Sequence, residues 1–533
     1  MFRTFFRRLN AEASTLASAA FFLAAAGVGS RLLGFFRNAL LAGKFGAGDE
    51  LDIYFAAFRI PDFVFSALFV GALSAGFIPV FTRIFHERKA EAWNLASDIL
   101  NITVLGFLML TVLFFVVAPQ IVPFLFPGFA GDRSDLAVHL SRIMFLQPVF
   151  LGISAVLGGV LQSFNRFFVF SLSPIFYNFG IILGVLFLVP IFGVPGLAWG
   201  VVLGAVLHMA IQVPTAFSLG FRWKWIIDFT LAGLKRMFTL MVPRSLSLIV
   251  TQLNLLAITV IASTLEKGSV AIFALANDLQ NFPIGVFAIS FAVAAFPALA
   301  RHLAAGNRKE FIESFGRAFR EILFWLLPAT ALFLVLAPDI VQVALRYGKF
   351  ETSSAALTTQ TLFIFSLGLA AQGLIPLVIR AFFAMENTLV PFLTGLFATA
   401  VNVVLSLLFA KTFGVAGLAF AFILSSYLQL LFLLLILRLE FGRVGGKVML
   451  QEGWKFLLGA ILAAFFAFGA RAVALEVFPA ETVAARFIRL GVAGAVGGGA
   501  YLGMCLILKC EELSVLKFFR RNSRRAHAIR LLE

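Results

Sequence analysis

Five arginines interrupt long apolar stretches of this sequence, and they are its most specific chemical feature: Arg31, Arg37, Arg59, Arg244 and Arg380. A guanidinium at bilayer depth costs at least a few kcal/mol unless it faces a wet cavity or a partner. Guanidinium groups bind phosphate and diphosphate through paired hydrogen bonds. The pattern therefore predicts a cationic cavity that binds an anion. The alternative is that some of these arginines lie near helix ends and snorkel to the membrane surface.

Two acidic residues lie close to these arginines in the sequence. Asp52 precedes Arg59 by seven residues, so both share one helical face, and Asp62 follows Arg59 by three, within pairing reach. Arg31 and Arg37 are six residues apart, which places them roughly 120° apart around a helix axis. Both can therefore face one cavity only if its wall is wide. The predicted substrate-binding residues are Arg31, Arg37, Asp52, Arg59, Arg244 and Arg380.

No enzyme, metal or cofactor pattern accompanies them. The glycines between Gly27 and Gly34 have the wrong spacing for a phosphate loop and lie in an apolar run, where glycine favours close helix packing. The five histidines are scattered, and Cys505 and Cys510 have no neighbouring histidine for a metal site. We therefore expect no catalytic residues, no metal and no cofactor.

Composition indicates that lipid is the main solvent of this chain. Of its 533 residues, 61% are hydrophobic and 13% are charged, and the mean hydropathy is +1.01. A soluble domain is about half apolar and about a quarter charged. The net charge of +16 would suggest nucleic acid in a soluble protein. Here it favours cytoplasmic loops that face anionic membrane lipids, and we expect no nucleic-acid partner.

Fourteen apolar segments are long enough to be transmembrane helices. They are 15–42, 51–82, 95–126, 136–162, 168–190, 195–219, 237–264, 270–300, 315–336, 355–385, 389–410, 415–438, 455–475 and 486–509. The first resembles a signal peptide but continues into further spans, so we interpret it as a retained helix. With both termini in the cytoplasm, inner loops and ends hold 26 of the 42 Lys and Arg residues and outer loops hold eight. The excess of Lys and Arg in the inner loops predicts that both termini lie in the cytoplasm.

Three short motifs recur in order at nearly one offset. Phe192-Gly-Val-Pro-Gly-Leu-Ala198 returns as Phe413-Gly-Val-Ala-Gly-Leu-Ala419, and Ala118-Pro-Gln-Ile-Val122 returns as Ala337-Pro-Asp-Ile-Val341. Pro79 and Pro297 form the third pair. The repeat covers about six helices, an even number, so the two copies have the same orientation and their interface is the expected substrate site.

The predicted fold is therefore an all-α polytopic membrane protein with two parallel six-helix lobes and two C-terminal helices. The predicted parts are an N-lobe at 1–220, a C-lobe at 221–440, helices thirteen and fourteen at 441–510, and a basic cytoplasmic tail at 511–533.

The order of several motifs resembles the MurJ (MviN) lipid II flippases of the MOP exporter superfamily. They are Ser30-Arg-Leu-Leu-Gly-Phe-Phe-Arg37, Phe45-Gly-Ala-Gly48, Phe58-Arg-Ile-Pro61, Phe77-Ile-Pro79, Asn165-Arg-Phe167, Phe282-Pro-Ile-Gly285, Tyr347-Gly-Lys-Phe350 and Arg380-Ala-Phe-Phe383. Asp52 belongs to the same series. The sequence departs from the family at Ser66 and Val70, where an Arg and a Glu are frequent, and at Asp278, where an Arg is frequent.

The resemblance implies a flippase in the bacterial inner membrane that works by alternating access around a cationic cavity. Its substrate would be lipid II, an undecaprenyl-diphosphate-linked peptidoglycan precursor, with the lipid tail in a groove formed by the last two helices. Arg31, Arg37 and Asp52 match functional charges of the family. Membrane lipids and cell-wall synthesis proteins are the expected partners. An exporter of another lipid-linked oligosaccharide or of drugs, and a non-transporting membrane scaffold, are the alternatives.

Overall fold

The computed structural model describes residues 16–67, 72–228, 232–442 and 446–513, without the side chains of 16–24, 72–75, 232–236, 238–248 and 446–451. All regular secondary structure among these residues is helical. This is what the apolar composition requires, because backbone N–H and C=O groups in lipid must find partners within their own segment. The predicted all-α class is confirmed. The first 15 residues and the part of the predicted tail after 513 lie outside the described residues.

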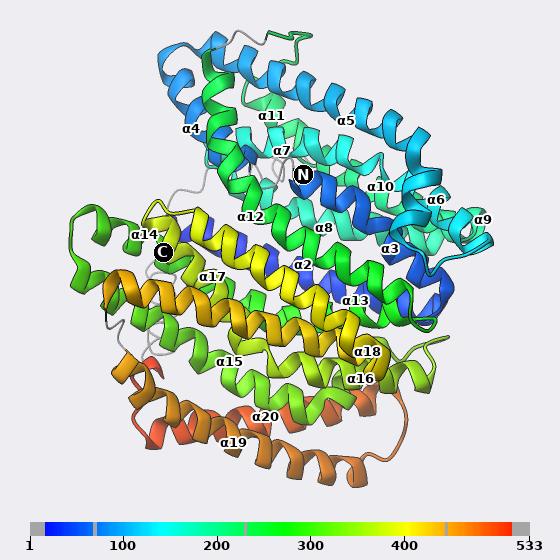
Figure 1. Ribbon diagram of the computed structural model, residues 1–533, viewed down its shortest axis with the longest axis vertical. Coiled ribbons are helices and arrows are strands. Elements are labelled where there is room, and N and C mark those ends of the chain that lie inside the picture. Colours follow the sequence, from blue (N-terminus) through cyan, green and yellow to red (C-terminus); the bar gives the residue numbers. More distant parts are fainter. Residues whose placement is uncertain (1–15, 68–71, 229–231, 443–445, 514–533) are drawn as a thin grey trace, which may run out of the picture. The chain divides into compact units, whose positions relative to one another are not determined.

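The first half of the chain forms the helices coloured blue to green in Figure 1. They are α2 (Leu16–Phe45), α3 (Asp49–Phe65), α4 (Ala72–Glu87), α5 (Lys89–Leu125), α6 (Asp132–Met144), α7 (Gln147–Ser163), α8 (Phe167–Leu183), the π-helical turn η2 (Gly184–Leu188), α9 (Val189–Phe192), α10 (Pro195–Ala210) and α11 (Val213–Ser218).

The second half repeats this order and then adds two helices. It comprises α12 (Ala232–Ser263), α13 (Ser269–Pro283), the π-helical turn η3 (Ile284–Ala288), α14 (Ile289–Ala304), α15 (Arg308–Leu345), α16 (Thr352–Leu367), α17 (Leu369–Ala384), α18 (Leu389–Phe441), α19 (Gly446–Val477), α20 (Val483–Ile507) and the 3₁₀ turn η4 (Glu511–Leu513). Figure 1 shows α19 and α20 lying side by side.

The Phe-Gly-Val repeat has the same backbone conformation in both copies. Gly193 follows α9 with φ 65° and ψ −146°, and Gly414 breaks α18 with φ 57° and ψ −137°. Only glycine takes such a conformation without strain. The Ala-Pro repeat likewise lies in two long helices, α5 with 37 residues and α15 with 38. These matches support the internal repeat, and the lobe boundaries stay a prediction.

Nine helices or continuous helical runs of the described residues are long and apolar enough to cross a membrane, and the pair α16–α17, bent by 48°, makes a tenth. α18 counts once here, although Gly414 divides it into the two spans predicted at 389–410 and 415–438. The spans predicted at 15–42, 51–82 and 237–264 include residues or side chains outside the description. The polytopic character is confirmed, and the count of fourteen stays a prediction.

The chain forms two compact units. The first comprises Met1–Leu275, Ala344–Ser354 and Gly395–Ala421, and the second comprises Ala276–Val343, Ala355–Thr394 and Phe422–Glu533. Three segments of the predicted C-lobe, 221–275, 344–354 and 395–421, thus belong to the first unit. The unit boundaries therefore do not coincide with the predicted lobe boundaries.

Each unit has its own apolar core. In the first unit, Phe77, Phe81, Trp93 and Phe164 form an aromatic cluster at one end of α4, α5 and α7, with ring centroids 5.2 to 6.2 Å apart. Such aromatic pairs add about 0.5–1.5 kcal/mol each to the burial of their area. The cluster fixes α4 and α5 against α7, which also lines the first unit's cavity.

In the second unit, the core joins α19 and α20 to α15. The Tyr501 hydroxyl donates a 2.6 Å hydrogen bond to the Phe324 carbonyl oxygen. Asp339 on α15 forms an ion pair with Arg471 on α19, and Arg320 on α15 contacts Glu512 at 2.9 Å. The two added helices are therefore fixed to α15 by polar contacts as well as by apolar packing.

Candidate functional site

Arg37 is held in place by two asparagines. Its Nη1 donates to Oδ1 of Asn178 on α8 at 3.0 Å, and its Nε and Nη2 donate to Oδ1 of Asn38 at 3.1 and 2.9 Å. Asn178 in turn donates from Nδ2 to Ser30 Oγ at 3.3 Å and to the Pro174 carbonyl oxygen at 3.0 Å. These partners are neutral amides, and they orient the guanidinium without adding a negative charge of their own.

Arg31 lies on the same helix, α2, and is half-buried. No hydrogen bond or ion pair from a described residue reaches it, in contrast to Arg37. A half-buried guanidinium whose donors bond no described residue is a strong candidate for binding an anion. The structure thus places two predicted site residues on one helix, one of them oriented by protein groups and one open.

Asp52 is buried and caps another helix. Its Oδ2 accepts a 2.7 Å hydrogen bond from the Gly268 N–H, and its Oδ1 accepts a 2.8 Å bond from the Ala271 N–H. These amides belong to the start of α13, where a carboxylate is favoured by unsatisfied N–H groups and by the helix dipole. The geometry gives Asp52 a structural role at this point; its predicted substrate contact stays a prediction.

Asp49, one turn before Asp52, completes the same connection. It contacts Arg133 Nη2 at 3.0 Å and Lys267 Nζ at 2.8 Å. We name this set the α3–α13 junction: Asp49, Asp52, Arg133, Lys267, Gly268 and Ala271. Nearby in the same unit, the Lys349 N–H donates to the Gly43 carbonyl oxygen at 2.7 Å. All these residues lie in or beside loops that the charge bias places outside, so the outer ends of the first unit are joined to one another.

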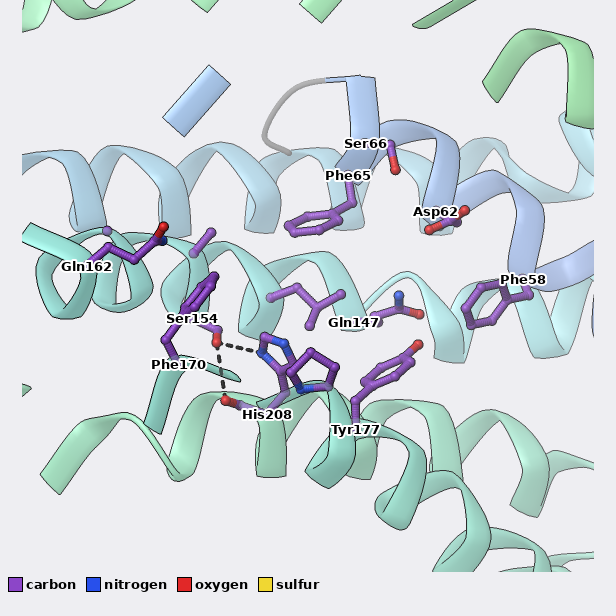
Figure 2. Close-up of a pocket in the computed structure, with 14 residues that line it drawn as sticks. Phe58, Asp62, Phe65, Ser66, Gln147, Ser154, Gln162, Phe170, Tyr177 and His208 are labelled. Atoms are coloured by element: carbon purple, nitrogen blue, oxygen red, sulfur yellow. Dashed lines mark hydrogen bonds between the residues drawn. The ribbon is translucent and has the colours of Figure 1, made fainter. Parts of the chain in front are cut away.

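Arg59 is half-buried on α3, and its charge acts on the Asp62 carboxylate one turn later. Asp62 faces a cavity of about 540 Å³ that lies within the first unit. Figure 2 shows its lining residues, which come from α3, α7, α8 and α10. Arg31 and Arg37 are not among them. The predicted charges of the first unit therefore do not all converge on one cavity.

Arg380 and Arg244 complete the predicted set. Arg380 on α17 belongs to the second unit, is half-buried and donates from Nη1 to the Pro376 carbonyl oxygen at 3.0 Å. The side chain of Arg244, on α12, lies outside the described residues. Their predicted role in binding substrate stays a prediction.

A group of polar side chains joins α12 to α18. Asn402 Nδ2 donates to Asn254 Oδ1 at 2.6 Å, and Ser406 Oγ donates to Asn402 Oδ1 at 3.3 Å. Asn402 and Ser406 are fully buried. Among the described residues, no group of three or more His, Cys, Asp or Glu could hold a metal ion. The three side chains satisfy one another as a neutral hydrogen-bonded set.

Comparison with known proteins decides the family. The family model described as "Lipid II flippase MurJ" matches residues 41–492. The chain is 32% identical to the probable lipid II flippase MurJ of Rhizobium meliloti strain 1021 over 429 residues, which are 78% of this chain and 80% of the relative. It is 31% identical to the corresponding protein of Rhizobium tropici over 417 residues, 75% of this chain and 77% of the relative.

The chain belongs to the lipid II flippase MurJ family.

Solved structures agree with this fold. A MurJ family structure, "Lipid II flippase MurJ, inward closed conformation", matches with a TM-score of 0.75 at 24% identity, covering 92% of this chain and 98% of that one. A multidrug resistance MATE transporter of the MOP superfamily in an inward-facing conformation matches with a TM-score of 0.66 at 15% identity, covering 80% of this chain and 99% of that one. The predicted resemblance to MurJ is confirmed, and the likeness to the MATE transporter is one of fold.

Several important residues of this MurJ family member were not singled out from the sequence. Asn178 orients Arg37, and Gln147, Tyr177 and His208 line the cavity. Their only signal was their presence as polar side chains in apolar segments. Ser66, noted as a departure from the family, accepts a 2.9 Å hydrogen bond from Gln252 and also lines the cavity. Val70 lies outside the described residues.

Proposed function

We propose that this protein moves lipid II from the inner to the outer leaflet of the bacterial cytoplasmic membrane by alternating access. Its membership of the MurJ family, whose curated relatives are named lipid II flippases, supports the substrate. The single structural observation that favours it is the arrangement of Arg31 and Arg37 on α2. One guanidinium is oriented by neutral amides, and the other is open.

The diphosphate of lipid II is the part that these arginines recognise. A diphosphate offers several negative oxygens, and guanidinium groups bind such oxygens through two parallel hydrogen bonds. Arg37 is oriented by Asn38 and Asn178, and its guanidinium contributes positive potential on the same helix as Arg31. Arg31, with its donors available, forms the direct contact. Arg59, Arg244 and Arg380 add positive potential along the path.

The α3–α13 junction acts as the outer gate. Its ion pairs and helix cap hold the outer ends of the first unit together, which is the arrangement required when the cavity opens to the cytoplasm. Release of substrate on the outer side requires Asp52 to leave the first turn of α13. A conformational change of this kind is driven only by a difference in binding free energy between the two states. The membrane potential can supply about 2.3 kcal/mol per charge per 100 mV.

The remaining features of the proposal follow from the sequence. Both termini lie in the cytoplasm, α19 and α20 border the groove for the lipid tail, and the protein is a transporter without catalytic activity. Cell-wall synthesis proteins that make or consume lipid II are its functional partners.

Reconstitution tests the function directly. Proteoliposomes are prepared with fluorescent lipid II in both leaflets, and a membrane-impermeant reductant quenches the outer leaflet. An active flippase continuously supplies inner-leaflet lipid II to the reductant, so quenching proceeds to completion. Empty liposomes and liposomes with Arg31→Ala should stop near one half. A fluorescent lipid-linked oligosaccharide of another headgroup serves as the substrate control, and its preferential transport over lipid II would contradict the proposed substrate.

A further inference from the structure

The cavity of the first unit has features that the transport of an anion does not explain. Its lining comes entirely from helices of that unit and has a volume of about 540 Å³. Pockets for small organic molecules typically measure roughly 300–1,000 Å³. A bare inorganic ion would leave most of this space empty. The size therefore suits a small organic molecule.

Unpartnered acceptors lie on the wall of this cavity. Gln147 is only 1% exposed, and its Oε1 has no hydrogen-bond partner among the described residues. The Tyr177 hydroxyl is likewise buried and without a hydrogen-bond partner in the described part of the chain. Figure 2 shows this hydroxyl pointing toward the Gln147 amide. Buried polar atoms of this kind cost free energy unless a ligand or water satisfies them.

Three side chains at another wall of the cavity bond one another. Ser154 Oγ lies 2.7 Å from His208 Nδ1, and Gln212 Nε2 donates to Ser154 Oγ at 2.5 Å. Because these groups bond one another, they fix the shape of this wall and α7 against α10. Among the described lining residues, the free hydrogen-bonding capacity thus lies around Gln147, Tyr177 and Asp62, while Oε1 of Gln212, which is not in the lining, also has no partner in the described part of the chain.

The charge of the lining is acidic. Asp62 is the only Asp, Glu, Lys or Arg among the described lining residues. Arg59 lies one turn earlier on α3, and its positive charge acts on Asp62 although Arg59 is not among the lining residues. No described group donates a hydrogen bond to the Asp62 carboxylate. Arg37 lies near the Tyr177 end, where the two asparagines hold it. A carboxylate that faces the cavity repels a diphosphate and attracts a cation.

Aromatic side chains form much of the remaining surface. Phe58, Phe65, Phe170 and Tyr177 all line the cavity, and aromatic faces attract cations that lack a full hydration shell. The combination of one carboxylate, unpartnered acceptors and aromatic walls is chemically the reverse of the arginine site on α2. We propose that this cavity is a second binding site, specific for an amphipathic organic cation with N–H donors.

The assignment concerns one unit only and does not depend on lipid II transport. The cation's N–H groups donate to Asp62, Gln147 and Tyr177, and its apolar body packs against the phenylalanines. A ligand seated there contacts α3, α7, α8 and α10 at once, so it stabilises the first unit as a body.

Ethidium is a suitable probe because it combines a cationic aromatic body with amino donors, and its fluorescence rises in an apolar site. Purified full-length protein in a nonionic detergent is titrated with ethidium, and we expect saturable binding. Asp62→Asn, which keeps the shape and removes the charge, should weaken the affinity about tenfold or more, the loss expected for one desolvated ionic contact. The matched control is Asp135→Asn, an exposed acid on α6 of the same unit, which should bind as the wild type does.

Two further variants keep the test decisive if Asp62→Asn is poorly folded. Tyr177→Phe removes one hydroxyl and should weaken binding about threefold, and Ala155→Phe fills the cavity and should abolish it. Phenanthridine, the uncharged parent ring, should bind more weakly than ethidium and be insensitive to Asp62→Asn. The proposal is wrong if ethidium binding is not saturable, or if monodisperse Asp62→Asn, Tyr177→Phe and Ala155→Phe proteins bind ethidium as the wild type does. Lipid II transport is measured in a separate assay, so failure of ethidium binding would not contradict the proposed flippase function.

Discussion

The guanidinium of Arg37 donates a 3.0 Å hydrogen bond to Oδ1 of Asn178, a residue 141 positions later in the sequence. The contact joins α2 to α8 and fixes the direction of a positive charge in a largely apolar environment. An aspartate at position 178 would bind Arg37 more tightly and neutralise it. An amide at this position orients Arg37 without adding a negative charge beside it.

This relationship predicts the effect of Asn178→Asp. The variant should fold with equal or higher thermal stability, because an ion pair replaces the hydrogen bond from Arg37 to a neutral amide. Lipid II flipping should fall about tenfold or more, the loss corresponding to one charge-assisted contact of roughly 1.5–3 kcal/mol. The liposome quenching assay measures it. Asn94→Asp, which lies at the start of α5 beside Lys224, is the matched control and should remain active. Wild-type flipping by Asn178→Asp would rule out this role for Arg37.

Arg31 should be more sensitive to substitution than the exposed arginines. Arg31→Ala should abolish flipping while the protein remains folded and inserted. Arg31→Lys should also be impaired, because an ammonium cannot form the paired hydrogen bonds of a guanidinium. Arg88→Ala serves as the control, since Arg88 makes only an exposed 3.0 Å pair with Glu91. Growth of a flippase-depleted strain that expresses stable Arg31→Ala protein would remove Arg31 from the site.

The outer gate can be tested through Asp52. Asp52→Ala removes both hydrogen bonds to the first turn of α13, a loss of roughly 1 kcal/mol for a helix cap. Spin labels at residues 50 and 266 report the distance across the α3–α13 junction. We expect a single narrow distance in the parent and a broader, longer distribution in Asp52→Ala. Asp132→Ala, an exposed acid at the start of α6, should leave the distribution narrow. An unchanged distribution in Asp52→Ala would show that the junction does not hold the gate.

The ion pair between Asp339 and Arg471 should stabilise the attachment of α19 to α15. Asp339 is 6% exposed and Arg471 is 24% exposed. Asp339→Asn should therefore cost about 2 kcal/mol, less than the roughly 3–5 kcal/mol of a fully buried pair. The melting temperature measures this loss, and Glu91→Gln, which affects an exposed pair, should change it little. Arg471→Gln should lower the melting temperature less in the Asp339→Asn background than in the wild type. If the two substitutions lower it by fully additive amounts, the two residues do not form a direct pair.

Cysteine reactivity offers a test of packing after α20. Burial raises the pKa of the Cys510 thiol above its ordinary value. The thiolate is the reactive form, so alkylation by a maleimide should be slow at neutral pH and should still be increasing above the ordinary thiol pKa of about 8.5. The Cys505→Ser variant leaves Cys510 as the only cysteine. A rate that reaches its plateau below pH 8.5 would contradict the buried position.

The extent of what the sequence predicts differs between the fold and the site. Apolar length alone located the helices, because the bilayer imposes the same requirement on each. Arg31 and Arg37 were found because charge in an apolar segment is costly. The sequence did not predict that Asn178 would be the partner of Arg37, or that Asp52 would cap α13. Those contacts join residues 141 and 216 or more positions apart and arise only when the helices pack. Asp62 was expected to lie within pairing reach of Arg59, whose charge does act on it, but its position on the cavity wall was not predicted.

The shared backbone conformation of Gly193 and Gly414 has an evolutionary consequence. A turn that only glycine tolerates, preserved at the same place in both halves, implies duplication of a gene that encoded one half. Because each half is predicted to contain an even number of transmembrane helices, its copies are expected to enter the membrane with the same orientation. The ancestral product could therefore have worked as a homodimer of six-helix chains. Fusion then freed the two halves to diverge, so that one could acquire arginines without forcing the same change on its twin.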